Sequence, residues 1–343
     1  MGIRDALAKI VEGEDLSEQE AAEAMQDIAT GTATPAQIGA FAVALRMKGE
    51  TVDEMAGLAR VMRAAALRVA VDEPVLDTCG TGGDGAGTFN ISTTAAIVAC
   101  AAGARIAKHG NRAASSLTGS ADILGALGVV FDLPPEAAAE CIRETGIGFL
   151  FAPAYHPALA SVAGPRREMG VRTVFNVLGP LANPAWAQHQ LLGVPTPQIA
   201  PKMAEVLKRL GTVHTMVVHG QGLDEVTLTG TTEVDEVVGG EVRHWTIDPR
   251  EHGYQLIALE ALKGGDAAYN AELARKVLAG ERSPYRDVVE LNAGAALLAA
   301  DKAPSLGEGI AKAREAIDSG AAARKLAQVV EVSQRLKQNL VPA

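Results

Sequence analysis

The chain has 343 residues, of which 48% are hydrophobic, 21% charged and only 3% aromatic, and its formal net charge is −10. An acidic chain with so few aromatic rings lacks the basic face and the stacking platforms with which proteins bind nucleic acid. Its most continuous apolar stretch, residues 95–104, is far shorter than the roughly 20 residues of a membrane span, and no apolar signal core follows Met1. We therefore expect a cytoplasmic protein without a nucleic-acid or membrane partner and, from its length, two domains.

The N-terminal part of the chain carries the start signals of successive helices. Ser17 with Glu20 three positions later forms a capping box, and a proline follows Thr34 at the first position of the next helix. Thr51 with Glu54 opens a further helix. We expect this stretch to form a helical domain with a structural role, because it contains no charge cluster and no group of His and Cys side chains.

From residue 73 to residue 343, apolar strands alternate with helices. The candidate strands are residues 75–76, 104–108, 147–151, 191–194, 215–218 and 242–247. This alternation predicts a larger α/β domain with a mostly parallel central sheet, next to a small all-helical domain over residues 1–72. Ligands of such sheets bind at the carboxyl ends of the strands, where Lys108 and His219 lie.

A glycine-rich stretch, residues 77–94, organises the rest of the chain. Five glycines lie between positions 80 and 87, after an apolar strand and before a buried helix. Because glycine has no Cβ atom, backbone N–H groups can converge on a phosphate there, and the helix N-terminus adds partial positive charge. A glycine cluster alone is typical of a flexible surface loop. The flanking elements and the hydroxyl groups of residues 81, 88 and 92–94 favour an anion site instead.

Two nucleotide-binding motifs are alternatives for this stretch. Gly80, Gly82 and Gly85 form a literal G-x-G-x-x-G, the dinucleotide fingerprint. That motif requires a ribose-binding acid about 20 residues later, where this chain has Lys108 and His109. The triphosphatase P-loop requires Gly-Lys-Ser/Thr, which this stretch lacks.

Three strings of the sequence resemble those of anthranilate phosphoribosyltransferases: Gly-Thr-Gly-Gly-Asp at 80–84, Thr-Phe-Asn-Ile-Ser-Thr at 88–93, and Lys-His-Gly-Asn-Arg at 108–112. The resemblance implies transfer of 5-phosphoribose from 5-phosphoribosyl-1-pyrophosphate (PRPP) to the amine of anthranilate, with release of pyrophosphate, in tryptophan biosynthesis. It also implies Mg²⁺ as cofactor, a homodimer formed through the helical domain, and a fold of the nucleoside phosphorylase/phosphoribosyltransferase type. In that fold the helical domain, joined by part of residues 160–185, forms one wall of the substrate cleft.

The resemblance also implies which residues form the site. For PRPP these are Gly80, Gly83, Asp84, Thr88, Asn90, Ile91, Ser92, Thr93, Lys108, His109, Gly110, Asn111, Arg112, Ala113, Ala114, Ser115, Ser116 and Ser120. For anthranilate they are Gly80, Asn111, His156 and Arg166, and for the metal Ser92, Asp224 and Glu225. The catalytic roles fall to Lys108, Asn111 and Arg166.

The chemistry of the charged residues agrees with these roles, although each has an ordinary alternative. The cations and hydroxyls of residues 108–116 suit a phosphate and pyrophosphate clamp, but a solvated basic turn would look the same. Ser120 is predicted to be a helix N-cap that could also bind phosphate, and capping alone would explain it. Adjacent Asp224 and Glu225 repel each other, and a divalent cation bridging them to pyrophosphate would relieve this. Surface acid pairs are nevertheless common.

On the acceptor side, a guanidinium fork at Arg166 matches a benzoate carboxylate, as a lysine would not. Its alternative is a salt bridge to Glu168 or Asp132. The resemblance implies that His156 neighbours the channel through which the aromatic acid enters. The alternative is a histidine that caps a helix. An anilinic amine is neutral at pH 7, so no strong general base is required.

Two other functions remain open from the sequence. A pyrimidine nucleoside phosphorylase shares the fold and uses phosphate as nucleophile, but residues 111 and 112 and the pair at 224 and 225 argue against it. The second open function is that of a nucleic-acid-binding homologue, which has the same fold but no transferase activity. The acidic charge and the intact substrate residues argue against that one.

Overall fold

A computed structural model of the chain describes residues 2–113 and 117–340. The helices are α1 (Ile3–Val11), α2 (Glu18–Ala29), α3 (Pro35–Lys48), α4 (Val52–Ala65), α5 (Ile91–Ala101), α6 (Ser120–Leu127), α7 (Pro135–Thr145), α8 (Ala152–Tyr155), α9 (Ala160–Met169), α10 (Phe175–Leu178), α11 (Ala200–Arg209), α12 (Ala267–Leu278), α13 (Pro284–Ala299), α14 (Leu306–Asp318) and α15 (Ala321–Gln338). Short 3₁₀ turns are η1 (Pro157–Leu159), η2 (Gly179–Leu181), η3 (Pro197–Ile199), η4 (Pro249–His252) and η5 (Leu259–Leu262). The strands are β1 (Leu76–Gly80), β2 (Ile106–Gly110), β3 (Ile147–Phe151), β4 (His189–Gly193), β5 (His214–His219), β6 (Thr232–Val238) and β7 (Glu241–Ile247).

The described strands form one seven-stranded sheet in the order β3-β2-β1-β4-β5-β6-β7. From β3 to β5 neighbouring strands are parallel, and β6 and β7 continue the sheet as antiparallel strands. The predicted mostly parallel sheet beside a small helical domain is thus confirmed. The strand boundaries were less accurate, since β1 and β2 run two to four residues further than expected, and β6 was missed.

The N-terminal helices start where their capping residues predict. Ser17, Thr34 and Thr51 each accept a hydrogen bond from the backbone N–H three residues later, and each forms a reciprocal capping box. These boxes satisfy backbone N–H groups that a helix leaves without partners in its first turn. The caps therefore fix where α2, α3 and α4 begin.

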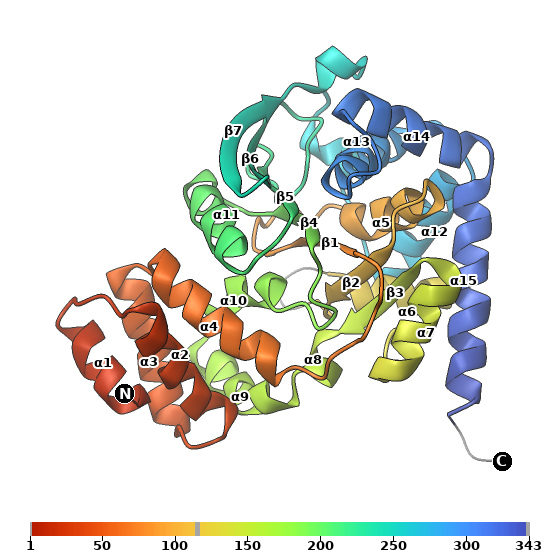
Figure 1. The fold of residues 1–343 in the computed structure, drawn as a ribbon. Helices are drawn as coiled ribbons and strands as arrows, with labels where there is room; N and C mark the ends of the chain where they lie inside the picture. Colours follow the sequence, from red (N-terminus) through yellow and green to blue (C-terminus); the bar gives the residue numbers. More distant parts are fainter. Residues whose placement is uncertain (1, 114–116, 341–343) are drawn as a thin grey trace.

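Figure 1 shows the four N-terminal helices, in red and orange, gathered at one end of the molecule with α9 beside them. Helix α9 contacts α3 and α2, so a segment from the middle of the chain packs against the N-terminal helices. Residues 160–185, here called the crossover, contain α9, α10 and η2. The division of the chain into domains at residue 72 stays a prediction.

Two large apolar cores lie on opposite sides of the sheet. The first packs α5, α13, α14 and α15 against residues such as Leu76, Ile106 and Met216. The second includes the buried faces of α1–α4, the crossover and α11, and continues onto Leu192 and Val217 of the sheet. Because side chains alternate along a strand, neighbouring residues of β4 and β5 belong to different cores. Among the described residues, no helix is both long and apolar enough to traverse a lipid bilayer.

Candidate active site

The predicted site segments meet at the carboxyl ends of three parallel strands, β2, β1 and β5, with β4 between β1 and β5. The glycine-rich loop follows β1, the Lys108 segment ends β2, and Asp224 and Glu225 follow β5. Direct hydrogen bonds join them: Gly82 N–H donates to Asp224 Oδ2 at 2.7 Å, and Ser92 N–H donates to Glu225 Oε1 at 3.1 Å. Segments more than a hundred residues apart in sequence therefore form one constellation.

The glycine loop has a conformation that other residues rarely adopt. Gly82, Gly83, Gly85 and Gly87 have φ angles of +67°, +87°, +68° and +62°. In this left-handed region a side chain is strained, whereas glycine is not. Thr81 is fixed by its N–H, which donates to Gly193 O at 2.9 Å. The loop can therefore turn its N–H groups toward a ligand, as expected for a phosphate cradle.

Helix α5 begins directly behind this loop, and its N-cap residue is Asn90. The Asn90 side chain does not cap the helix; its Nδ2 donates to Thr118 O at 3.1 Å and its Oδ1 accepts from Asn270 Nδ2 at 3.0 Å. In the first turn of α5, Ile91 N–H donates to Phe89 O at 2.8 Å and Ser92 N–H donates to Glu225 Oε1 at 3.1 Å. This helix end has the partial positive charge that favours an anion.

Lys108 lies almost wholly inside the protein, with 3% of its surface exposed. Its ammonium donates to Thr78 O and lies 3.4 Å from Ser92 Oγ. Burial lowers the pKa of Lys108, and the negative charge of Asp77 opposes that shift. Lys108 is therefore held at the base of the constellation, next to the predicted metal ligand Ser92.

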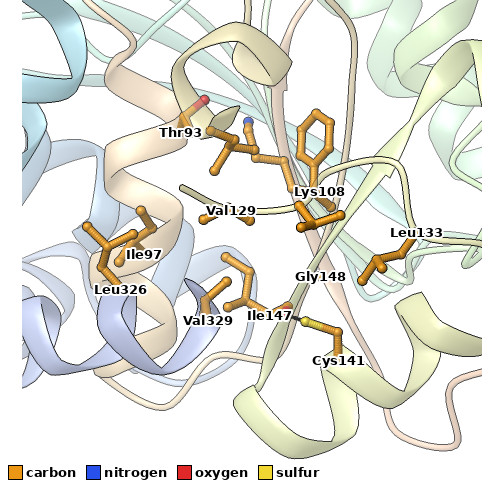
Figure 2. Close-up of a pocket in the computed structure, with 13 residues that line it drawn as sticks. Thr93, Ile97, Lys108, Val129, Leu133, Cys141, Ile147, Gly148, Leu326 and Val329 are labelled. Carbon is orange, nitrogen blue, oxygen red and sulfur yellow. Dashed lines mark hydrogen bonds between the residues drawn. The ribbon is translucent and has the colours of Figure 1, made fainter. Parts of the chain in front are cut away.

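The stem of Lys108 lines a small apolar cavity (Figure 2). Apart from Thr93 and Lys108, the lining includes Ile97, Val129 and Ile147, and the space amounts to about 20 Å³. This volume admits about one water molecule and no substrate. This cavity is therefore too small to be the substrate site.

Asp224 and Glu225 are partly buried and lie close to Asp84. Burial raises the pKa of Asp224, as does the charge of Asp84; burial and the charge of Asp224 raise the pKa of Glu225. Among the described residues no three His, Cys, Asp or Glu side chains are placed to bind a metal by themselves. Two carboxylates that repel each other fit Mg²⁺, which is commonly bound by one or two carboxylates plus substrate phosphate oxygens.

The segment after Lys108 is braced by Asp122. Arg112 Nη1 donates to Asp122 Oδ1 at 3.0 Å, and the N–H groups of Ala113 and Gly119 donate to Asp122 Oδ2, each at 3.0 Å. Ser120 was predicted to be the N-cap of α6, but this is wrong. Gly119 is the N-cap, because its φ and ψ are extended and the Asp122 carboxylate accepts its N–H; Ser120 is the first helical residue.

Ser120 Oγ instead donates to Asn111 O at 3.2 Å, which ties the helix to the clamp segment. Asn111 Oδ1 accepts from Arg112 N–H at 2.7 Å. The predicted PRPP residues Ala114, Ser115 and Ser116 lie outside the described residues. The remaining predicted PRPP residues belong to two of the three segments that meet at the strand ends, the glycine loop with the start of α5 and the segment that begins at Lys108, or, for Ser120, to the start of α6.

The predicted anthranilate residues come from four places in the chain: Gly80 ends β1, Asn111 directly follows β2, His156 follows α8, and Arg166 lies on α9 of the crossover. Arg166 is exposed on α9, and partial burial and the charge of Arg172 lower its pKa. Within the described residues neither Glu168 nor Asp132 forms an ion pair with Arg166; Asp132 pairs with Lys337. The ordinary alternative for Arg166, a salt bridge, is therefore not found.

His156 contacts His109 directly. Their Nε2 atoms lie 3.3 Å apart, and 8% and 5% of the two residues are exposed. Burial lowers the pKa of His156 to about 4 and that of His109 to about 3, so both imidazoles are neutral at pH 7. His156 also ends α8 as its C-cap residue. The position of His156 is thus compatible with both roles considered for it, a helix cap and a neighbour of the anthranilate entry channel.

Sequence reasoning missed three residues that shape the site. Arg172 Nη2 donates to Thr81 O at 3.3 Å, and its guanidinium lies against Gly83. Asp77 and Asn183 form a buried hydrogen bond beneath the site. For Asp77 the available signal was a carboxylate directly after the apolar residues Val75 and Leu76, whereas no such local signal marks Arg172 or Asn183.

Comparisons with known proteins agree with this geometry. A family described as "Glycosyl transferase family, a/b domain" matches residues 72–323, and "Glycosyl transferase family, helical bundle domain" matches residues 4–66. An anthranilate phosphoribosyltransferase of Anaeromyxobacter sp. is 57% identical over 329 residues, which cover 96% of this chain and 98% of the relative. The anthranilate phosphoribosyltransferase of Chloroflexus aurantiacus is 54% identical over 336 residues, which cover 97% of this chain and 99% of the relative. The chain belongs to the anthranilate phosphoribosyltransferase family.

Solved structures of anthranilate phosphoribosyltransferases have the same fold. The Thermus thermophilus enzyme superimposes with a TM-score of 0.92 at 49% identity, covering 96% of this chain and 99% of that one. The Saccharomyces cerevisiae enzyme in complex with PRPP and Mg superimposes with a TM-score of 0.89 at 29% identity. The same enzyme in complex with 4-fluoroanthranilate superimposes with a TM-score of 0.86 at 28% identity. Both alignments cover 97% of this chain and 98% of the yeast chain. The family predicted from the glycine loop and clamp is confirmed, and with it the class of enzyme.

Proposed function

We propose that this chain transfers 5-phosphoribose from PRPP to the amine of anthranilate in an Mg²⁺-dependent reaction that releases pyrophosphate. The observation that carries the proposal is the pair of hydrogen bonds from Gly82 and Ser92 to Asp224 and Glu225, which join an anion loop to a pair of carboxylates. The yeast relative in complex with PRPP and Mg, and the same enzyme with 4-fluoroanthranilate, support it. In tryptophan biosynthesis this is the second-step transferase reaction.

On the donor side, the glycine loop, the start of α5 and the clamp segment would bind PRPP. Loss of pyrophosphate from the anomeric carbon leaves positive charge on the ribose ring while negative charge grows on the leaving group. N–H groups of the loop and the ammonium of Lys108, already fixed by Thr78 and Ser92, would stabilise that negative charge without rearranging. Catalysis is therefore chiefly electrostatic.

Ser92, Asp224 and Glu225 would hold Mg²⁺. When bound, the cation neutralises charge on the departing pyrophosphate. Burial raises the pKa of both carboxyls, as do the charge of Asp84 at Asp224 and the charge of Asp224 at Glu225. A cation would favour the ionised form of both groups and so oppose these shifts. The Ser92 hydroxyl lies 3.4 Å from the Lys108 ammonium, so the residues that would hold the metal adjoin the ammonium that would stabilise the leaving group.

On the acceptor side, Arg166 would bind the anthranilate carboxylate and Asn111 would orient the molecule. No carboxylate of the described residues pairs with Arg166, so its guanidinium is available for one from a ligand. The aromatic amine is neutral at pH 7 and needs positioning rather than a strong base. His156 and His109, both neutral, would provide the uncharged wall that an aromatic ring requires.

We also expect a cytoplasmic homodimer formed through the helical domain. Val11 of α1 is 63% exposed and Met47 of α3 is 82% exposed, so both apolar side chains are available for contact with another chain. A second copy of the chain would cover them. Sedimentation or light scattering, with Met47→Glu as the variant, measures this directly.

Anthranilate fluorescence provides the decisive assay. When purified protein is mixed with anthranilate and PRPP, the anthranilate fluorescence should fall only if Mg²⁺ is present. One pyrophosphate should be released for each anthranilate consumed. Phosphorolysis of thymidine or uridine without that reaction would instead indicate a nucleoside phosphorylase. Retardation of single-stranded DNA by a protein inactive in both assays would indicate the nucleic-acid-binding homologue.

A further inference from the structure

The Asp77 carboxylate is buried directly beneath the proposed substrate site. It lies in β1, three residues before Gly80, and none of its surface is exposed. Oδ1 accepts from His109 N–H at 3.0 Å, and Oδ2 accepts from Asn183 Nδ2 at 2.8 Å. Among the described residues no cation lies within ion-pair distance of this carboxylate, so these two bonds are its principal anchors.

Asn183 is the other half of this arrangement, with 2% of its surface exposed. Its Nδ2 also donates to Ala107 O at 2.8 Å, and its Oδ1 accepts from Ala185 N–H at 2.8 Å. The amide orientation is therefore set by three partners. Asn183 lies near the end of the crossover, so Asp77 and Asn183 together join β1, the end of β2 and the crossover.

Burial of a charged carboxylate costs free energy, so these two hydrogen bonds are made at the expense of stability. Burial raises the pKa of Asp77 to about 6, although the charge of Lys108 opposes the shift. A neutral asparagine would cost less free energy to bury, but it has one acceptor oxygen in place of two. If that oxygen accepts from His109 N–H, the new NH₂ group faces the Asn183 NH₂ group. If it accepts from Asn183, His109 N–H loses its acceptor. Only a carboxylate accepts from both donors at once.

We propose that Asp77 is a positioning residue for the phosphoribosyl transfer: together with Asn183 it fixes the backbone of residues 107–111 relative to the glycine loop and the crossover. The inference rests on the proposed function, because it concerns the same site. Lys108 and Asn111 lie on either side of the anchored His109 N–H, and Arg166 lies on the crossover. Donor and acceptor residues are thus aligned through one carboxylate, and small misplacements of reacting groups cost large factors in rate.

The test compares Asp77→Asn with Glu290→Gln in the full chain. Glu290 is also a buried carboxylate, 1% exposed, which accepts from Arg286 Nε at 2.6 Å and from the Tyr254 hydroxyl at 3.0 Å but touches no residue of the proposed site. Both variants should lower Tm. Only Asp77→Asn should lower kcat/KM for both substrates, by roughly 10- to 100-fold, as for other residues that orient a functional group.

Asn183→Ala separates the two anchors, because it leaves the bond between Asp77 and His109 N–H in place. Its expected effect is a larger rise in the KM for anthranilate than in that for PRPP, since it releases the crossover that carries Arg166. Should Asp77→Asn fail to fold, this variant still tests the inference. Kinetic constants equal to wild type in Asn183→Ala, or in a folded Asp77→Asn, would overturn it.

Amide hydrogen exchange tests the positioning role independently of turnover. The segment 107–111 should exchange faster in Asp77→Asn than in wild type, and at the wild-type rate in Glu290→Gln. An inactive wild-type protein would contradict the proposed function, whereas unchanged exchange in this segment in an active protein would contradict only the role of Asp77.

Discussion

The Asp224 carboxylate lies directly against Gly80, so that a Cβ atom at position 80 would overlap its Oδ2 and Cγ. Gly80 has no positive φ, so its requirement for glycine comes from this close approach. Gly80→Ala should displace the carboxylate and raise the half-saturating Mg²⁺ concentration about tenfold or more. Gly164→Ala is the control, because a Cβ there meets no atom within 4 Å, and it should leave the Mg²⁺ titration unchanged.

Removal of one charge from the acid pair should separate metal binding from folding. In Glu225→Gln the side-chain carbonyl can still accept from Ser92 N–H, but the repulsion by Asp224 is lost. We expect a higher Tm without ligands, a smaller rise in Tm on addition of Mg²⁺ and PRPP, and a weaker Mg²⁺ dependence of the rate. Glu233→Gln on β6 is the matched control. An unchanged Mg²⁺ titration would remove Glu225 from the metal site.

Substitution of Arg166 should affect one substrate more than the other. Arg166→Ala removes a guanidinium that pairs with no carboxylate in the described part of the chain, so the KM for anthranilate should rise far more than that for PRPP, by roughly 10-fold or more. Arg167→Ala, one residue along on the same exposed turn of α9, should change neither. Equal effects of Arg166→Ala on both constants would argue against the carboxylate role.

His214 predicts a pH dependence of stability. Its Nδ1 lies 2.7 Å from Asp301 Oδ1 and its Nε2 lies 2.9 Å from Glu236 Oε1, so the imidazolium donates to both carboxylates. Burial lowers the pKa of His214, but these hydrogen bonds raise it more, to a net value above the ordinary one. A raised histidine pKa stabilises the fold below the unfolded-state pKa of about 6.5, and this stability is lost as pH rises through the folded value.

The partner carboxylate behaves in the opposite sense. The hydrogen bond from His214 lowers the pKa of Glu236, so its contribution is lost as pH falls through the folded value, below the ordinary 4.5. His214→Gln should therefore lower the free energy of unfolding by about 2 kcal/mol near pH 6, and by less near pH 9. His244→Gln, whose side chain is 58% exposed, should have a much smaller effect. Urea unfolding at several pH values measures both.

Local signals in the sequence predicted local structure well. The caps at Ser17, Thr34 and Thr51 were correct because a helix start depends on residues three positions apart. The cap at Ser120 was placed one residue late, because the Asp122 carboxylate that caps the turn accepts equally from a glycine. The glycine loop was recognisable because its glycines follow a strand and precede a helix.

Long-range relationships could not be read in the same way. No pattern in β1 indicates that it pairs with β4, more than a hundred residues later, rather than at the edge of the sheet. The bond between Asp77 and Asn183 depends on that arrangement and on the path of the crossover. Strand β6 was missed because Thr232–Val238 is half polar, which suits a strand whose residues are only alternately buried. The roles assigned to the substrate and metal residues stay predictions.

The apolar core shared by the N-terminal helices and the sheet bears on how the protein unfolds. Leu45 and Met55 belong to the same buried cluster as Leu192 of β4 and Val217 of β5. The helices therefore cannot separate from the sheet without exposing apolar surface on both sides, and water penalises that exposure. Heating should melt the helices and the sheet in a single cooperative transition, and motion between them should be small hinge-like adjustment rather than detachment.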